Sequence, residues 1–304
     1  MTSTQVQAVL DEMIVKWEID ALVIDHYISA MHIKLPRYDV KTCIIKLNRE
    51  AEFYADQLKY EKSAWYRWTH QLDLLRLIWL ERKIDNSVGK VIAIGVPDIP
   101  KGKTQSPGTC ITPYLDRMPV QWRYTDSRCV FFVGNISHYP NRLAIEWIAT
   151  KLAPEMAQIC PGIGIKIVGC TPQDVRASWQ QPNVQFLGAM DRAYVKNLFC
   201  HADLMLCPIE NDFGMKFKSA EAIAFGTPLL ASIQTLRGLT YLTTPPAIDL
   251  NRPEAAATLV RDLLACKERL IELSAAQTRD YTAFVKTQKS IWTSTLDDTP
   301  PLSR

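Results

Sequence analysis

The chain has 304 residues, of which 47% are hydrophobic and 22% charged, values typical of a globular protein with one large or two medium domains. Its formal net charge of +3 at pH 7 is too small to indicate a nucleic-acid partner, and none is predicted. The eight cysteines include no C-x-x-C pair, so we expect reduced core thiols in a cytoplasmic protein rather than disulfides or a zinc site. We expect neither a signal peptide nor a membrane span.

The first third of the chain alternates between helical and strand-like patterns. Apolar residues recur at helical spacing over 5–19, and short apolar runs predict buried strands. In chain order the predicted elements are a helix over 5–19, a strand over 21–24, a strand over 40–47, a helical stretch to about residue 62, a helix over 63–83 and a strand over 90–94. Strands that alternate with helices indicate a parallel α/β sheet.

The predicted helix over 63–83 combines tryptophan and tyrosine with interleaved arginines. One interpretation is an amphipathic helix that makes a peripheral contact with a membrane surface. The other is a helix that packs its aromatic face on a sheet, which is the commoner arrangement for such helices. The sequence leaves both interpretations open.

Residues 97–128 interrupt the alternation of strands and helices. Five prolines and two glycines fall in this stretch, and its one short apolar core is Cys110–Ile111. Such a composition is typical of an interdomain connection. We therefore predict a linker here, with a short strand near Ile111.

The alternation resumes at residue 129 and is more regular than before. The predicted elements are strands over 129–134, 164–169, 184–187, 203–207 and 228–231, helices over 142–152, 192–200 and 217–225, and further helices from 253 to about 291. This order predicts a doubly wound domain with five or six strands. Ligands of such sheets bind at the carboxyl ends of the strands, which here carry Gly134, Gly169, Gly188 and the loop 208–218.

The loop and helix that follow the strand over 203–207 form a candidate anion site. The loop contains Gly214, Lys216 precedes the predicted helix and Lys218 lies in its first turn. A helix N-terminus carries partial positive charge and unpaired N–H donors, so this arrangement suits a phosphate. Lys218 and Glu221 are three residues apart and share one helix face, which would place a cation for a diphosphate beside a carboxylate for sugar hydroxyls. The alternative is an ordinary strand–helix–strand unit with its charges in solvent.

Four segments together resemble the group 1, GT4-like glycosyltransferases of the GT-B fold. They are FVGNISHYPN at 132–141, IKIVG at 165–169, VQFLGAM at 184–190 and GMKFKSAEAIAFGTPLLAS at 214–232. The resemblance implies two Rossmann-like domains with parallel sheets, which bind a nucleotide-sugar in the cleft between them. We predict a shortened N-terminal, acceptor-side domain with its linker over 1–117 and a nucleotide-sugar-binding domain with C-terminal helices over 118–304.

The N-terminal domain is expected to be incomplete, because the chain starts with a segment similar to the family's third helix. A minimal form, a fragment and a chain completed by a homodimer or a partner chain are the alternatives. Within this domain, DHY at 25–27 resembles the strand end that presents the family's active-site histidine. The resemblance makes His26 a candidate for contacting the donor sugar or its phosphate. The alternative is a histidine at a strand end whose hydrogen bonds are satisfied within the protein. Asn48 and Glu50 are candidates for the acceptor side or for a turn.

The resemblance assigns the remaining nucleotide-sugar contacts to the C-terminal domain. It implies that Glu221 binds the ribose, that Lys218 neutralises the diphosphate and that Lys216 flanks it. Gly134 would let the loop backbone approach the phosphates, and the sugar contact of the family's first signature glutamate stays open between Glu210 and Asp212. The predicted catalytic set is His26, Lys218 and Glu221, and the predicted donor-binding set is Gly134, Asn135, Gly214, Met215, Lys216, Lys218 and Glu221.

The implied reaction moves a sugar from a nucleotide-sugar to a hydroxyl of a saccharide or lipid-linked acceptor, as in a hexosyltransferase of polysaccharide biosynthesis. Its leaving diphosphate needs stabilisation by positive charge. The sequence has no D-x-D motif or ligand-spaced cluster, so we expect metal-independent transfer without a cofactor, and the resemblance implies retention of configuration. The alternatives are a catalytically weakened nucleotide-sugar-binding or partner subunit and, ranked lower, a nucleotide-sugar 2-epimerase. The expected setting is the cytoplasm, with the chain either free or peripheral at the membrane.

Overall fold

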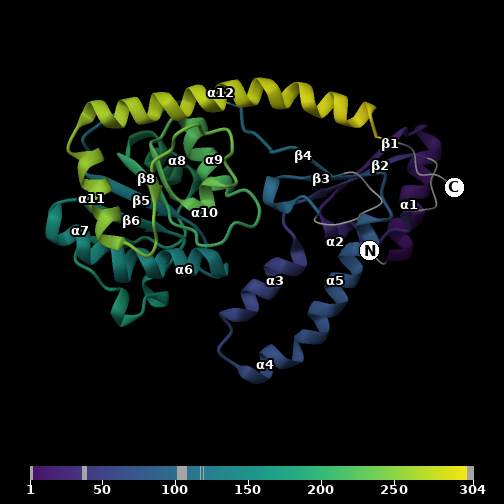
Figure 1. The fold of residues 1–304 in the computed structure, drawn as a ribbon, viewed down its shortest axis with the longest axis horizontal. Helices are drawn as coiled ribbons and strands as arrows, with labels where there is room; N and C mark the ends of the chain where they lie inside the picture. The colour runs from purple at the N-terminus through teal and green to yellow at the C-terminus, as the bar shows by residue number, and fades with distance from the viewer. Residues whose placement is uncertain (1–2, 36–39, 101–107, 117, 119, 300–304) are drawn as a thin grey trace. The chain divides into compact units, whose positions relative to one another are not determined.

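The computed structural model describes residues 3–35, 40–100, 108–116, 118 and 120–299, so parts of the predicted linker lie outside the described residues. The chain divides into two compact units (Figure 1). Unit 1 comprises Met1–Pro113, Phe213–Met215 and Thr287–Arg304, and unit 2 comprises Tyr114–Asp212 and Lys216–Lys286. The predicted boundary between residues 117 and 118 falls near this division, but the last part of the chain groups with unit 1.

Unit 1 is built on a four-stranded parallel sheet in the order β1-β2-β3-β4. Its elements are α1 (Ser3–Lys16), β1 (Ala21–Asp25), α2 (Tyr27–Ala30), β2 (Lys41–Lys46), α3 (Glu50–Lys59), α4 (Ala64–Thr69), α5 (Gln71–Asp85), β3 (Lys90–Ala93), η2 (Val96–Asp98) and β4 (Gly108–Cys110). The strands lie where the apolar runs predicted them. The parallel α/β sheet of this half is therefore confirmed.

The sheet of unit 1 buries side chains on both faces because successive strand residues point to opposite sides. Ile44 and Val91 are paired in register and belong to one buried cluster, which also contains Ile84 of α5. Cys43 and Ile92 belong to a second cluster with Ile111, and Ile291 and Trp292 of the last helix pack against it. This packing explains why residues from 287 onward group with unit 1.

The predicted helix over 63–83 is wrong as a single element, because the structure has two helices there. Ser63 caps α4 by accepting a hydrogen bond from the Tyr66 N–H at 3.1 Å. The Thr69 hydroxyl donates to the carbonyls of Trp65 and Tyr66, and the His70 ring stacks on Tyr66 at 3.6 Å. Such local side-chain bonds compete with continuation of the helix, so the chain turns at His70 and α5 starts anew.

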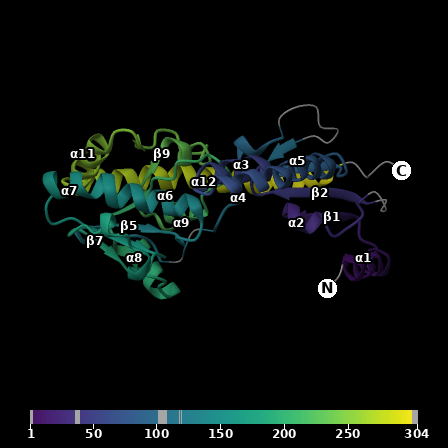
Figure 2. The same cartoon turned by 90° about the horizontal axis from the view of Figure 1, so that it is seen from below.

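Unit 2 is built on a six-stranded parallel sheet in the order β10-β9-β8-β5-β6-β7. Its strands β5, β7 and β9 are labelled in Figure 2. Its elements are β5 (Cys129–Val133), α6 (Tyr139–Trp147), the π-helix η3 (Ile148–Leu152), α7 (Ala153–Ile159), β6 (Gly164–Val168), η4 (Pro172–Asp174), η5 (Ala177–Trp179), β7 (Val184–Phe186), α8 (Arg192–His201), β8 (Leu204–Cys207), α9 (Phe217–Phe225), β9 (Leu229–Ser232), α10 (Ile233–Leu236), β10 (Ala247–Ile248), α11 (Pro253–Leu264) and α12 (Lys267–Asp297). Residues of α12 up to Lys286 belong to this unit. The doubly wound domain is confirmed.

The central strands of unit 2 read as continuous apolar runs because helices cover both faces of the sheet. Every residue of β8 and of β9 is buried. Helix α9 has the predicted bounds and ends at Gly226, whose φ of 79° is the left-handed conformation that closes many helices. Within the described ranges, no helix is both long and apolar enough to cross a membrane.

The strand order of unit 2 reverses between β5 and β8, which are neighbours in the sheet but not in the chain. From β5 the chain winds toward β7 on one side, and from β8 toward β10 on the other. In doubly wound sheets, the carboxyl ends of the strands at such a reversal are the usual place for a ligand. The loops after β5 and β8 both carry residues of the predicted donor-binding set.

Candidate functional site

The loops after β5 and β6 are held together at two glycines. The Gly134 N–H donates to the Val168 carbonyl at 2.9 Å, and the Ile136 N–H donates to the Gly169 carbonyl at 2.9 Å. Gly169 has a φ of 95°, and a Cβ atom there would lie 2.5 Å from the Gly134 oxygen. Only glycine fits at position 169, and its absence of a side chain lets the two loops touch.

Lys218 reaches the loop after β5 from the first turn of α9. Its Nζ donates to the Asn141 Oδ1 at 2.5 Å and lies 4.4 Å from the centre of the Phe132 ring. A Cβ atom at Gly134 would be 2.6 Å from this nitrogen, so the glycine makes room for the ammonium group. This role of Gly134 differs from the predicted one, in which the glycine lets the loop backbone approach the phosphates. The predicted role stays a prediction.

The ammonium group of Lys218 is desolvated without a compensating negative charge. Burial lowers the pKa of Lys218 to about 8. Among the described residues, no carboxylate forms an ion pair with it. A buried cation without an anionic partner is unfavourable by itself, and a bound anion would relieve it. Lys218 is therefore the strongest candidate for binding a phosphate group.

Lys216 and the start of α9 add positive potential beside Lys218. Lys216 donates to the Asn211 Oδ1 at 2.8 Å, and the Asn211 amide donates to the Tyr139 hydroxyl at 3.2 Å, which ties the loop after β8 to the start of α6. The first turn of α9 contains no acidic residue. A helix N-terminus and two lysines at one place are an arrangement that suits an anion.

His138 is a site residue that the sequence analysis missed, although it lies in the segment FVGNISHYPN. Burial lowers the pKa of His138, and the charges of Lys218 and Lys216 lower it further. The histidine therefore lies near both lysines and is neutral at pH 7. A neutral imidazole can bind a polar ligand without repelling the two ammonium groups. Its position four residues after Gly134, in the same loop, could have indicated from the sequence that it lies near the predicted phosphate site.

Asn135 and Asn141 both form hydrogen bonds at the start of α6. The Asn135 Oδ1 accepts hydrogen bonds from the Ser137 N–H at 2.9 Å and from its hydroxyl at 2.8 Å, so this side chain shapes the turn before α6. Asn141 was not predicted, yet it contacts Lys218 and donates to the Asn135 carbonyl at 2.9 Å. The donor-binding role of Asn135 stays a prediction.

Glu221 lies one turn after Lys218 on α9 and is half-buried. Burial raises the pKa of Glu221, and the charge of Arg192 at the start of α8 opposes that effect. In the part of the chain that the structure describes, its carboxylate has no hydrogen-bond partner. A partly desolvated carboxylate with free lone pairs suits the paired hydroxyl groups of a sugar.

Gly214 and Met215 belong to unit 1, unlike the lysines that follow them. The Gly214 N–H donates to the carboxylate of Asp98 at 3.0 Å, and the fully buried Asp98 also accepts from the Arg49 N–H at 3.2 Å. Gly214 has a φ of 61°, and a Cβ atom there would lie 2.7 Å from the Leu47 oxygen. The N–H of Gly214 is therefore already satisfied, and a close fit within unit 1 requires the glycine.

His26 stands at the end of β1 with a φ of 66°, a conformation that is uncommon for residues other than glycine. Its Nδ1 accepts a hydrogen bond from the Ile28 N–H at 3.2 Å, so the neutral ring carries its proton on Nε2. This Nε2 lies 3.5 Å from the Oε1 of Glu50. Burial raises the pKa of Glu50, an effect that His26 opposes. The Glu50 carboxylate therefore faces the Nε2 of His26 at the end of β1.

A buried ion cluster fixes the position of Glu50. Lys46 pairs with Glu81 at 2.7 Å and with Asp85 at 2.9 Å, and it is 2% exposed. The carboxylate of Glu81 also accepts from the N–H groups of Glu50 and Ala51 at 3.3 and 3.2 Å, which caps the first turn of α3. The cluster therefore holds the start of α3, and Glu50 with it.

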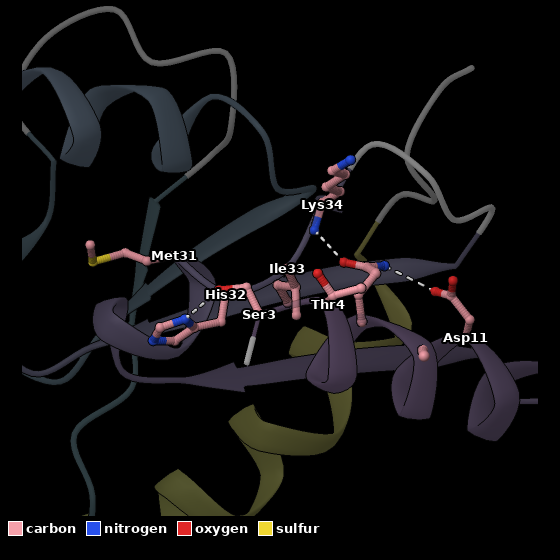
Figure 3. A pocket seen from close by; sticks show the side chains of 9 residues that line it. Ser3, Thr4, Asp11, Met31, His32, Ile33 and Lys34 are labelled. Atoms are coloured by element: carbon pink, nitrogen blue, oxygen red, sulfur yellow. Dashed lines mark hydrogen bonds between the residues drawn. The ribbon is translucent and has the colours of Figure 1, made fainter. Parts of the chain in front are cut away.

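A pocket of about 350 Å³ lies elsewhere in unit 1, between α1 and the segment 31–34 (Figure 3). The Ser3 hydroxyl lies 3.1 Å from the Nδ1 of His32. Gln7 accepts from the Lys34 N–H at 2.7 Å and donates to Asp11 at 2.9 Å. The polar groups of this pocket bond one another, and the pocket contains none of the predicted site residues. The described residues hold no group of three or more potential metal ligands.

The chain is similar to known proteins in sequence and in fold. Residues 127–265 match the family of glycosyl transferases group 1. Similar solved structures include a sucrose-phosphate synthase from Thermosynechococcus elongatus (14% identity, TM-score 0.68, 95% of this chain and 76% of that one) and the trehalose-6-phosphate synthase OtsA (13% identity, TM-score 0.65, 98% and 77%). TarM has 10% identity and a TM-score of 0.68, and this chain spans 55% of its length. No curated protein sequence matches the chain.

These comparisons confirm three predictions. The resemblance to the group 1 glycosyltransferases is confirmed by the family match, and the GT-B fold by the solved structures. The predicted class of enzyme, a glycosyltransferase, is confirmed with the family. The roles of individual residues stay predictions.

Proposed function

We propose that this glycosyltransferase of the GT-B fold, whose residues 127–265 belong to group 1, transfers a sugar from a nucleoside diphosphate sugar to a hydroxyl group of a saccharide or lipid-linked acceptor. The observation that carries the proposal is Lys218, a desolvated ammonium group without a carboxylate partner in the described chain. It lies in the first turn of α9, next to the glycine loop after β5. A diphosphate supplies the charge that this site lacks.

The chemistry breaks the bond between the anomeric carbon and the diphosphate oxygen and forms a bond from that carbon to the acceptor oxygen. Negative charge then grows on the leaving diphosphate. Lys218, Lys216 and the N–H groups at the start of α9 are placed to stabilise it, and fixed charges that need no rearrangement are the most effective means of doing so. This supply of positive charge supports transfer without a metal ion. Retention of configuration stays part of the proposal on the resemblance alone, and it requires the acceptor oxygen to approach the anomeric carbon from the same face that the diphosphate leaves.

The diphosphate also keeps Lys218 protonated. An opposite charge within hydrogen-bond distance raises the pKa of an ammonium group above its value of about 8 in the free protein. Glu221 is placed to bind the ribose hydroxyl groups of the nucleotide, as the resemblance implies. His138 is neutral and adds a hydrogen-bond donor or acceptor beside the two lysines.

On the acceptor side, we propose that Glu50 accepts the proton of the acceptor hydroxyl group. The acceptor hydroxyl loses its proton as it attacks, and the raised pKa of Glu50 makes this carboxylate a better base than an exposed one. His26 orients it, because its Nε2–H faces the Glu50 carboxylate and its Nδ1 is held by the backbone. His26 is thus a positioning residue in this proposal. We place the reaction in the cytoplasm, which the eight free cysteines support.

The test is a thermal-shift panel on the full chain with UDP, GDP, ADP and dTDP, followed by assays of diphosphate release from sugars of the base that binds. A ligand that binds only the folded state stabilises it by about 2.7 kcal/mol at a hundred times its Kd. We expect one diphosphate to raise the melting temperature and its sugar to be turned over with an acceptor. Stabilisation without turnover of any donor would favour the nucleotide-sugar-binding subunit instead. If no diphosphate stabilises the protein, the assigned donor site is wrong.

A further inference from the structure

Helix α5 is apolar on two faces, and only one of them is covered. On the covered face, Ile84 is buried in the core of unit 1, and Leu77 and Leu80 pack against the same core. On the other face, Leu72 and Leu75 are more than half exposed, and Trp79 is 63% exposed. Positions 72, 75 and 79 are spaced by three and four residues, so they form one continuous stripe along the helix.

Helix α4 carries a second group of exposed aromatic side chains. Trp65 and Trp68 are 72% and 68% exposed, and their ring centres are 5.4 Å apart. Figure 1 shows α4 at the tip of the arm that α3 and α5 form, away from the strands of unit 1. We call Trp65, Trp68, Leu72, Leu75 and Trp79 the aromatic surface. Single exposed apolar residues are normal, but this many on adjacent helices indicate a binding surface.

Basic residues surround the aromatic surface, and acidic ones are scarce. Between residues 62 and 83 the exposed charged residues are Lys62, Arg67, Asp73, Arg76, Arg82 and Lys83. The one acid among them lies 3.2 Å from Arg76, and the Nζ of Lys83 lies 5.0 Å from the Trp79 ring. The acids Glu81 and Asp85 point inward to Lys46. This arm thus concentrates positive charge in a chain whose formal net charge is only +3.

We propose that the aromatic surface docks on an anionic lipid bilayer. Tryptophan rings favour the membrane–water interface, leucines favour the acyl boundary, and arginine and lysine bind the phosphates of lipid headgroups. Each basic residue near an anionic membrane strengthens binding by roughly fivefold. The packed alternative for these helices does not hold, because the structure leaves the aromatic face uncovered.

Charge argues against a second copy of this chain as the occupant. A two-fold contact places the same patch on both sides, so the basic residues of α4 and α5 would face one another. Anionic lipid instead provides the opposite charge and an apolar layer at the same place. Lipid binding by this surface does not depend on the proposed sugar transfer.

The test is co-sedimentation of the full chain with vesicles of phosphatidylcholine alone and of phosphatidylcholine mixed with phosphatidylserine, at low and high salt. We expect the protein to bind the anionic vesicles at low salt. High salt should lower this binding at least tenfold, because salt screens the surface charges, and neutral vesicles should bind at least tenfold less, because they offer no opposite charge. The triple substitution W65S, W68S and W79S should lower binding at least tenfold with an unchanged melting temperature. The matched control is Trp17→Ser, which removes a tryptophan that is 59% exposed outside the surface.

Three outcomes would overturn the proposal. The first is no binding to anionic vesicles, and the second is equal binding by the triple variant and the Trp17 control. The third is a concentration-dependent dimer in analytical ultracentrifugation that the triple substitution dissociates, because the surface would then join two copies. If the triple variant fails to fold, the charge reversal Arg82→Glu with Lys83→Glu serves in its place, with the same expected loss on anionic vesicles.

Discussion

Replacing Lys218 with methionine should stabilise the free protein while it abolishes diphosphate binding. Burial lowers the pKa of Lys218 from 10.5 to about 8. By linkage, such a shift means that the charged side chain destabilises the folded state at pH 7 by about 3 kcal/mol. Methionine keeps the length and removes the charge. It also loses the hydrogen bond to Asn141 and the contact with the Phe132 ring, together worth about 1–2 kcal/mol, so we expect a net gain of about 1–2 kcal/mol.

The pH dependence gives this prediction a sign that can be checked. A lysine with a lowered pKa destabilises the folded protein below pH 8, and the wild type recovers that free energy as the pH rises from about 8 to 10.5. The advantage of the methionine variant is therefore largest at pH 7 and shrinks at higher pH. Binding of the diphosphate to the wild type should weaken by up to tenfold per pH unit above about 8, because the free lysine loses the proton that binding requires.

The assay is urea and thermal denaturation of the full chain at pH 7 and about pH 9, with and without the diphosphate found by the panel. The control is Lys151→Met, which removes an exposed lysine from the π-helix of unit 2. Without ligand the Lys218 variant should be the more stable protein, and with saturating diphosphate the wild type should be. A variant that is less stable than the wild type at pH 7, yet is still stabilised by the diphosphate, would refute the reasoning.

Two further substitutions test the two parts of the proposed mechanism. Gly134→Ala places a Cβ atom 2.6 Å from the Nζ of Lys218, so calorimetry should show that the affinity for the diphosphate falls at least tenfold. The control is Gly164→Ala, where a Cβ atom meets nothing closer than 4.0 Å, and this variant should bind the diphosphate normally. Glu50→Gln should lower kcat by roughly 10²–10⁴ without changing diphosphate affinity, because it removes the proposed base only. The exposed neighbour Glu52→Gln is its control, and unchanged kcat in Glu50→Gln would contradict the assignment.

Much of the fold follows from local sequence. The strands of unit 2 are apolar runs that any parallel sheet covered on both faces would bury, and they formed where predicted. Helix α9 has the predicted bounds Phe217–Phe225, because good helix-forming residues are followed by Gly226 in the left-handed conformation and then Pro228. β10 was not located, since a two-residue strand has no detectable pattern of its own. The break at His70 depends on hydroxyl and ring contacts that apolar spacing does not reveal.

The site was only half determined by the sequence. The sequence indicated Gly134 and Lys218 as candidates, because a glycine loop and a lysine at a helix start are recognisable local patterns. The bond between Lys218 and Asn141 joins residues 77 apart, and it exists because β5 and β8 are neighbours in the sheet. The roles that we propose for His26 and Glu50 depend likewise on a backbone hydrogen bond and on a distance between two elements.

The sequence by itself determined most of the strands and helices and the residues that are candidates for binding a phosphate. Only the tertiary structure decided which of those residues are desolvated and which remain in water. Lys218 is partly buried and desolvation lowers its pKa, whereas the tryptophans of α4 and α5 remain exposed against the commoner expectation. The periodicity of apolar residues shows which face of an element is apolar. Whether a side chain on that face is exposed to water depends on which other segment of the chain packs against it.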